Sequence, residues 1–237
     1  MGTIVDKLNY LNDTKQAIKQ AIIDKGVSVA DTDTFRSYVN KILSIQSGTT
    51  PDYEKLAWSS ATGLKCENLV LNNFSSGVYA YIDKAFLPSS SPWEIVIKAT
   101  LPTLGTHMSL TGGYDNYFYF PELDITSAGK FQCCISYSGS GWGAYLVGTT
   151  VLSGNTTYWF KLEFTGTAYN SYLSIDGVNY ALEATTSTTS TIYQNGSYTK
   201  ACLGASSRTQ PFTGGRIDLK ESYMKINNEL FWGVKNG

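Results

Sequence analysis

The stretch that decides the fold is TYWFKLEFTGTAYNSYLSIDGVNY, residues 157–180. In its first part apolar and polar residues alternate, which predicts a strand with Leu162 and Phe164 facing a core and Glu163 facing the other side. Its second part places Asp176-Gly177 between two short strand-like runs, a strong hairpin signal. The stretch therefore predicts neighbouring antiparallel strands joined by a tight turn.

Similar runs recur through the rest of the chain and predict strands over residues 68–71, 77–82, 93–101, 117–120, 131–137, 144–147, 158–165, 171–175 and 216–226. Turn signals such as Asn72-Asn73 and Gly214-Gly215 separate these runs. No long helical pattern interrupts them, which excludes a parallel α/β sheet. We predict a mainly β fold, an antiparallel two-sheet sandwich of the jelly-roll type, with Trp93, Trp159 and Trp232 in its core.

The first part of the chain has a different character, because all 5 Trp and all 6 Pro come after it. We predict an N-terminal helical segment over residues 1–47 for attachment or oligomerisation, a linker over 48–52 and the sandwich over 53–237. Thr3 and Asp6 are placed to cap the first helix. Short helices with narrow apolar stripes must pack on each other, on a copy of themselves or on a larger body. Self-association is favoured, through Ile4, Leu8, Leu11, Ile18, Ile22, Phe35, Tyr38 and Ile42.

Charge and hydropathy exclude some function classes. The 18 Lys and Arg nearly balance the 19 Asp and Glu, which argues against a nucleic-acid binder with a clustered basic surface. No window approaches the ~20 apolar residues of a membrane helix, so no membrane insertion is expected. The first residues lack the basic and apolar regions of a secretory signal, so we expect a protein that folds in the cytoplasm without export.

Metal and cofactor motifs are also missing from the sequence. Cys66, Cys133, Cys134 and Cys202 form no Cys-x-x-Cys pair, and the neighbours Cys133 and Cys134 would point to opposite faces of a strand. We expect free, mostly buried thiols. With His107 as the only histidine and no ligand spacing like that of an EF-hand, no metal and no cofactor are assigned.

The order of the strand motifs resembles that of laminin G-like, concanavalin A-like domains. The resemblance is carried by residues 68–72, 79–82, 93–98, 157–164, the Asp176-Gly177 hairpin and the returning strand at 211–220. The N-terminal residues 3–8 and 31–38 resemble the helical leader of bacteriophage tail-fibre and related virion appendage proteins. The combination implies a virion protein whose helices attach or assemble it and whose sandwich faces outward.

The same sandwich class includes glycosidases, so an enzyme is an alternative to consider. Their motif runs Glu-x-Asp followed by a second Glu on one strand, and Glu122 and Asp124 match its first part. Residues 126–128 are Thr, Ser and Ala, so the acid/base carboxylate is missing. His107 has no carboxylate nearby in sequence, and no Gly-x-Ser-x-Gly motif marks a nucleophile. We predict no enzyme and assign no catalytic residue.

Aromatic and polar loops favour binding of a sugar, whose C–H faces stack on rings and whose hydroxyls bond to amides and carboxylates. The candidate glycan-binding residues are Tyr114, Asp115, Asn116, Tyr117, Trp142, Tyr193 and Asn195. We expect a tail-fibre or receptor-binding virion protein that is a homo-oligomer, preferably a trimer, bound to other virion proteins and to host surface polysaccharide. The alternatives are a structural head-fibre or capsid decoration protein without glycan binding, and a polysaccharide depolymerase.

Overall fold

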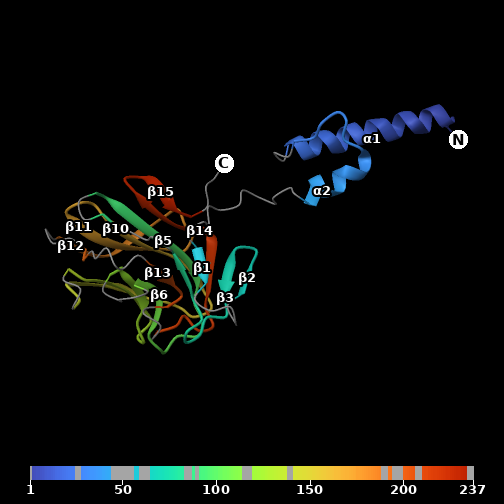
Figure 1. Ribbon diagram of the computed structural model, residues 1–237. Coiled ribbons are helices and arrows are strands. Elements are labelled where there is room, and N and C mark those ends of the chain that lie inside the picture. Colours follow the sequence, from blue (N-terminus) through green and yellow to red (C-terminus); the bar gives the residue numbers. More distant parts are fainter. Residues whose placement is uncertain are drawn as a thin grey trace. The chain divides into compact units, whose positions relative to one another are not determined.

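The structure is a computed structural model that describes residues 2–24, 28–43, 56–58, 65–82, 87–88, 91–113, 119–137, 141–187, 192–193, 200–205 and 210–233. The chain divides into two compact units, Met1–Thr50 and Pro51–Asn236 (Figure 1). The linker predicted at 48–52 lies outside the described residues. In the described part of the chain, no helix has both the length and the apolar character that a membrane crossing requires.

The N-terminal unit contains the helices α1 (Ile4–Asp24) and α2 (Tyr38–Leu43), with the 3-10 turn η1 (Phe35–Ser37) before α2. The predicted cap of α1 is confirmed: the Thr3 backbone N–H donates to the Asp6 carboxylate, and the Asp6 N–H donates to the Thr3 hydroxyl at 3.2 Å. Thr34 caps η1 by accepting from the Ser37 N–H. The unit is thus built from local capping signals on each helix.

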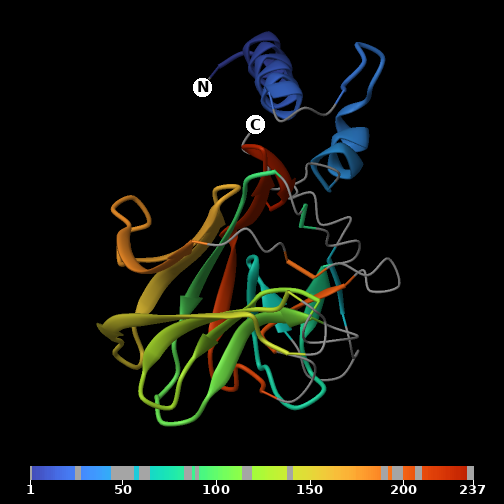
Figure 2. The same ribbon diagram turned by 90° about the vertical axis from the view of Figure 1, so that its left-hand side faces the viewer.

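The second unit is an antiparallel β-sandwich, as predicted. One sheet has seven strands in the order β1-β4-β13-β6-β7-β8-β9, and the other has eight, ordered β12-β11-β10-β5-β14-β3-β2 with β15 beside β14. Figure 1 and the turned view in Figure 2 show the sheets lying one over the other. The bounds are β1 (Leu56–Trp58), β2 (Lys65–Glu67), β3 (Val70–Asn72), β4 (Ala80–Ile82), β5 (Trp93–Thr100), β6 (Met108–Gly113), β7 (Glu122–Ile125), β8 (Lys130–Ile135), β9 (Ala144–Val151), β10 (Thr157–Phe164), β11 (Ala168–Ser174), β12 (Ala181–Ser187), β13 (Ala201–Leu203), β14 (Arg216–Ile226) and β15 (Glu229–Trp232).

The core lies between the two sheets and takes the inward residues of each strand. On β10 the alternation is the predicted one, since Leu162 and Phe164 are buried in the core and Glu163 is on the other face. The rings of Phe131 on β8 and Phe160 on β10 meet across the sheets, with centroids 5.0 Å apart. Burial of such apolar surface is the main force that holds the sheets together.

The hairpin predicted at Asp176-Gly177 joins β11 to β12, although its loop is longer than predicted and β12 begins at Ala181. Asp176 organises this loop: its carboxylate accepts from the backbone N–H groups of Val178 and Asn179. Gly177 has φ +74°, and an added Cβ would lie 2.8 Å from the Trp159 ring. The turn therefore requires glycine both for its backbone and for its packing on Trp159.

Two strand predictions fail for identifiable reasons. Tyr119 and Phe120, placed in a strand over 117–120, are not in a strand although both are buried in the core, because an apolar run marks burial and not backbone geometry. The central strand β6 (Met108–Gly113) is absent from the predicted strands, because a Gly-Gly pair such as Gly112-Gly113 is typical of a turn. All the described residues of β6 are buried, and a strand of this kind shows no alternation.

One carboxylate links the two sheets at an edge. Glu183 on β12, the edge of the eight-stranded sheet, accepts hydrogen bonds from the backbone N–H groups of Thr149 (2.7 Å) and Thr150 (2.9 Å) on β9, the edge of the other sheet. The Thr150 hydroxyl also donates to Glu183, at 2.6 Å. Backbone groups of an edge strand that would otherwise be open to another chain are thereby satisfied within the domain.

Candidate functional site

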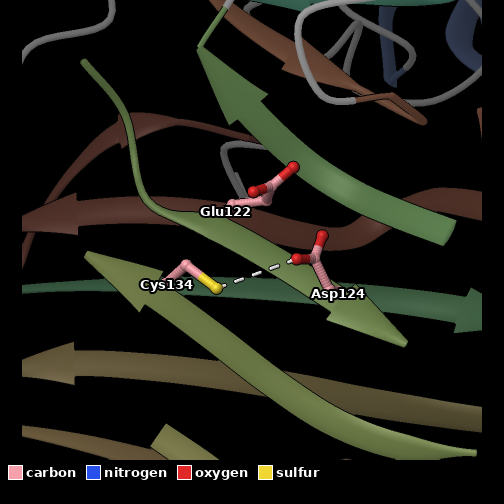
Figure 3. A group of neighbouring side chains, drawn as sticks. All are labelled: Glu122, Asp124 and Cys134. Atoms are coloured by element: carbon pink, nitrogen blue, oxygen red, sulfur yellow. Dashed lines mark hydrogen bonds between the residues drawn. The ribbon is translucent and has the colours of Figure 1, made fainter. Parts of the chain in front are cut away.

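A polar cluster is buried on β7, on the face turned away from the core. As predicted, Glu122 and Asp124 share one strand face, because Leu123 between them points into the core. Cys134 on β8 is the cross-strand partner of Glu122, and Ser109 on β6 is the partner of Asp124. Figure 3 shows Glu122, Asp124 and Cys134 on the same side of β7 and β8. The sheet register therefore gathers two carboxylates, a thiol and a hydroxyl.

The cluster is held by contacts from three strands and two loops. His107, in the loop before β6, places its Nε2 atom 3.1 Å from the Asp124 Oδ2 atom. The Ser109 hydroxyl lies 3.2 Å from both the Glu122 Oε1 and the Gln210 Oε1 atoms. The Cys134 Sγ atom lies 3.9 Å from Asp124 Oδ2, a contact drawn as the dashed line in Figure 3. His107 thus has a carboxylate partner that its neighbours in sequence did not reveal.

Burial has the largest effect on the pKa values of Asp124 and Cys134, whereas a hydrogen bond has the largest effect on that of His107. Asp124 is fully buried, and the loss of solvent raises its pKa although its hydrogen bond with His107 opposes the shift. The hydrogen bond to Asp124 raises the pKa of His107 against the opposing effect of its own partial burial. Burial likewise raises the pKa of the Cys134 thiol. The site therefore resists carrying negative charge unless a cation compensates it.

The glycosidase arrangement considered for this strand is incomplete. Thr126 follows Asp124 at the position where the strand face would continue, and its hydroxyl accepts from the Lys130 N–H at 3.1 Å instead of facing a substrate. Ala128 is in the turn after β7. Within residues 122–128 the two carboxylates therefore have no third carboxylate beside them to act as the acid/base.

Two of the predicted glycan-binding residues lie in segments that meet at Ser136. The Ser136 hydroxyl donates to the carbonyl oxygen of Gly141, next to Trp142, at 2.6 Å. The Tyr193 backbone N–H donates to the Ser136 carbonyl at 2.8 Å. Trp142 and Tyr193 are both half-buried. Residues Tyr114, Asp115, Asn116, Tyr117 and Asn195 lie outside the described residues, and their assignment stays a prediction.

This end of the sandwich is rich in aromatic rings. Tyr137, directly after Ser136, stacks on Tyr169 with ring centroids 6.3 Å apart, and Tyr169 stacks on Phe164 at 4.7 Å. Trp93 packs against both Phe164 and Tyr169. A pocket of about 240 Å³ opens at the same end, lined by Pro92, Trp93, Glu94, Glu163, Phe164, Thr165, Lys225 and Asn228. A Cβ added to Gly143, next to Trp142, would lie 2.1 Å from the Tyr137 ring, so the aromatic stack reaches the Trp142 segment.

The outer face of the eight-stranded sheet carries paired charges and aromatic rings. The prediction that Trp159 lies in the core is wrong: its indole Nε1 donates to Glu221 at 3.1 Å, and the Lys98 ammonium lies 4.7 Å from its ring centroid. Tryptophan can occupy an outward position on β10 because its apolar ring is covered by a lysine chain and by the Gly177 turn. Trp93 and Trp232 are in the core, as predicted.

A larger, polar pocket lies at the ends of β3 and β14. It has a volume of about 560 Å³ and is lined by Asn72, Asn73, Phe74, Ser75, Thr213, Gly214, Gly215 and Arg216. Asn73 and Gly214 both have positive φ, of 66° and 78°. The pocket offers amide, hydroxyl and guanidinium groups, which suit a hydroxylated ligand. From the sequence, Asn72-Asn73 and Gly214-Gly215 were predicted as turns and Arg216 as the start of a strand, and none of these residues was predicted to bind a ligand.

The predicted oligomerisation residues divide into two groups. Ile22 and Tyr38 are buried with Val29 in a small core inside the N-terminal unit, and Ile18 packs against them. Ile4, Leu8 and Leu11 on α1 are exposed, at 77%, 60% and 62%, and Phe35 is exposed as well. The side chain of Ile42 lies outside the described residues. The first half of α1 therefore presents an apolar stripe that this unit does not cover.

No protein-family model and no curated protein match the chain. Botulinum neurotoxin type C, whose cell entry depends on interaction with two ganglioside molecules, is similar with a TM-score of 0.52 and 10% identity, over 78% of this chain and 45% of that one. Domains LG4-5 of the mouse laminin α1 chain give a TM-score of 0.48 and 10% identity, over 76% and 48% of the two chains. The IT-sialidase CBM40 of Ruminococcus gnavus, bound to α2,3 sialyllactose, is similar with a TM-score of 0.45 and 18% identity. The match covers 60% of this chain and 78% of that one. The likeness at these identities concerns the fold, an antiparallel jelly-roll sandwich.

Proposed function

We propose that the chain is a bacteriophage virion appendage protein whose sandwich binds a host surface glycan without chemical reaction. The observation that carries the binding part is the meeting of the Trp142 and Tyr193 segments at Ser136, over a stack of aromatic rings. A half-buried Trp on a hydrogen-bonded loop offers a flat apolar face beside polar backbone groups, which is what a sugar ring requires. The fold likeness to a ganglioside-dependent toxin supports this by analogy only.

The virion part of the proposal rests on the helical unit. The exposed stripe of Ile4, Leu8 and Leu11 repeats at steps of four and three residues, the spacing of a helix–helix seam. Burying it against copies of α1 would assemble several sandwiches into one particle, preferably a trimer, and would attach them to other virion proteins. Multiple weak glycan sites would then act together with high avidity.

The binding proposal is tested on a glycan array with the full chain, the Trp142→Ala variant and the Trp159→Ala variant. Trp159 is the matched control, because it is also a half-buried Trp but lies on the outer face of β10. We expect at least about tenfold weaker binding for Trp142→Ala, in line with loss of one stacked ring, and little change for Trp159→Ala. If no glycan binds any version, glycan binding is wrong and the structural virion role is favoured.

The assembly proposal is tested by light scattering on the full chain, on a chain that begins at Thr50 and on two variants. Leu8→Lys places a charge in the stripe, and Val39→Lys is the control, because Val39 is an exposed apolar residue on α2. We expect an oligomer for the full chain and for Val39→Lys, and a monomer for the other two. Equal masses for the full and shortened chains would reject assembly through α1.

A further inference from the structure

Two carboxylates and a thiol are buried together on the outward face of β7 and β8. Asp124 is fully buried, Glu122 is 7% exposed and Cys134 is 2% exposed. One donor atom from each of these three residues lies within 4.8 Å of the others. Burying charged groups at such separations is costly unless a cation or a proton compensates them.

One atom in this cluster is left unsatisfied. The Oδ2 atom of Asp124 contacts His107 and Cys134, but the Oδ1 atom is buried and has no hydrogen-bond partner. In Figure 3 the oxygen of Asp124 that is not joined to Cys134 points to the side on which the Glu122 carboxylate lies. Buried carboxylate oxygens are rarely left without a partner in folded proteins. The unpaired atom therefore marks a position for a ligand between Asp124 and Glu122.

We propose that Glu122, Asp124 and Cys134 bind a divalent transition-metal cation of the zinc class, with His107 as a fourth ligand when its bond to Asp124 opens. Carboxylate, thiolate and imidazole together are the ligand types that zinc prefers, whereas calcium and magnesium take oxygen ligands. Ligands at about 2.0–2.3 Å from zinc require the donor atoms to close by roughly 1 Å from their present separation. Rotation of the side chains is sufficient for a movement of this size.

The surrounding residues suit ligands in their charged forms. The Gln132 side-chain N–H donates to the Cys134 sulfur at 3.1 Å, and the Ser109 hydroxyl is within reach of Glu122. Such outer contacts orient metal ligands and stabilise the thiolate. Because the ligands come from neighbouring strands and not from one loop, their spacing in sequence follows no familiar metal motif and predicts no metal site.

Cys133 is the matched control for Cys134, because the two neighbouring thiols lie on opposite faces of β8. Cys133 is fully buried and belongs to the core between the sheets, so its thiol is on the opposite side of β8. The exposed Cys66 could bind metal on its own, so it is replaced by Ser in every version tested. All versions are first stripped of metal with a chelator, and near-UV circular dichroism confirms that each is folded.

The experiment titrates the metal-free full chain with Co²⁺ alone and then displaces the Co²⁺ with Zn²⁺. We expect one equivalent of Co²⁺ to produce a thiolate-to-cobalt charge-transfer absorption, Zn²⁺ to remove it, and Zn²⁺ to raise the melting temperature. Cys134→Ser should abolish the absorption, Asp124→Asn should weaken binding at least tenfold, and Cys133→Ala should change neither.

Three outcomes of the Co²⁺ and Zn²⁺ titrations would overturn the proposal. They are the absence of Co²⁺ and Zn²⁺ binding at millimolar metal, a thiolate absorption that persists in Cys134→Ser, and an absorption lost from Cys133→Ala but kept in Cys134→Ser. A melting temperature that responds to Ca²⁺ equally in the parent and in Cys134→Ser would identify an oxygen-only site and would also reject the zinc class. The proposal is independent of glycan binding, because no readout contains a sugar.

Discussion

The outward carboxylates of the two sheets differ in how their charge is paired. On the eight-stranded sheet Lys161 lies between Glu94, at 2.7 Å, and Glu163, at 3.6 Å, and Lys225 reaches Glu94 from the other side at 3.3 Å. On the seven-stranded sheet the fully buried Asp124 has an imidazole as its partner and keeps one oxygen unpaired. The first arrangement balances charge and stabilises the fold, whereas the second retains charge at a cost in stability, which is typical of a binding site.

The largest loss of stability is expected from a substitution of Glu183, the carboxylate of the eight-stranded sheet that accepts hydrogen bonds from backbone N–H groups. Replacing Glu183 with Ala leaves the N–H groups of Thr149 and Thr150 without their acceptor, so the free energy of unfolding should fall by on the order of 3 kcal/mol. Chemical denaturation measures it. Leu182→Ala, at an exposed position of the same strand, is the control and should change stability little. Equal losses in the two variants would contradict the role given to Glu183.

The pH dependence of that effect follows from the pKa of Glu183. Burial opposes ionisation of this carboxyl, but its hydrogen bonds from Thr150 and Thr149 outweigh burial and lower its pKa. A lowered pKa stabilises the fold above the pKa of the unfolded chain, and the stabilisation is lost as pH falls through the folded pKa. The difference between the parent and Glu183→Ala should therefore shrink from pH 7 to below about pH 4.

A smaller loss of stability is expected from a substitution of Lys161, which lies between two carboxylates. Lys161→Met keeps the apolar chain but leaves Glu94 and Glu163 facing each other without their shared cation, and should lower the free energy of unfolding by about 1–2 kcal/mol. Lys220→Met, at an exposed position of β14, is the control and should cause a much smaller change. A Lys161→Met protein as stable as Lys220→Met would show that the charge pairing on this sheet contributes nothing.

The smallest change in the free energy of unfolding, and one of opposite sign, is expected from a substitution of Asp124 on the seven-stranded sheet. In metal-free protein, Asp124→Asn removes a charge from a buried position, so the free energy of unfolding should stay the same or rise by up to about 1 kcal/mol. Chemical denaturation in the presence of a chelator measures it. A fall of more than about 1 kcal/mol would mean that the ionised carboxylate stabilises the fold and would remove the contrast between the two sheets.

The sandwich could be predicted because strands with one face in the core and the other outside it alternate between apolar and polar residues. The β10 pattern and the Asp176-Gly177 signal depend on neighbours in sequence, and the structure confirms both. Strand β6 is buried on both faces and therefore shows no alternation. Trp159 was misplaced because an indole suits a core equally well, and only its contacts with Lys98 and Glu221 reveal an outward position.

In the buried cluster, the face of the strand on which each residue lies could be predicted from the sequence, but the contacts between strands could not. The common face of Glu122 and Asp124 follows from the period of two along a strand, as do the opposite faces of Cys133 and Cys134. The approach of His107 and Cys134 to Asp124 depends on which strands are neighbours and in what register, which no local pattern encodes. The contacts within the cluster were therefore visible only in three dimensions.

The self-contained turn at residues 175–180 also bears on the order in which the sandwich forms. Asp176 accepts hydrogen bonds from Val178, Asn179 and Ser174, so the hydrogen bonds that close the loop come from neighbouring residues. Local hairpins form in about 1–10 μs, whereas pairing β5 with β14 must bring together segments separated by most of the domain. We expect β11 and β12 to nucleate folding, with β10 and then β5 and β14 adding to them in turn.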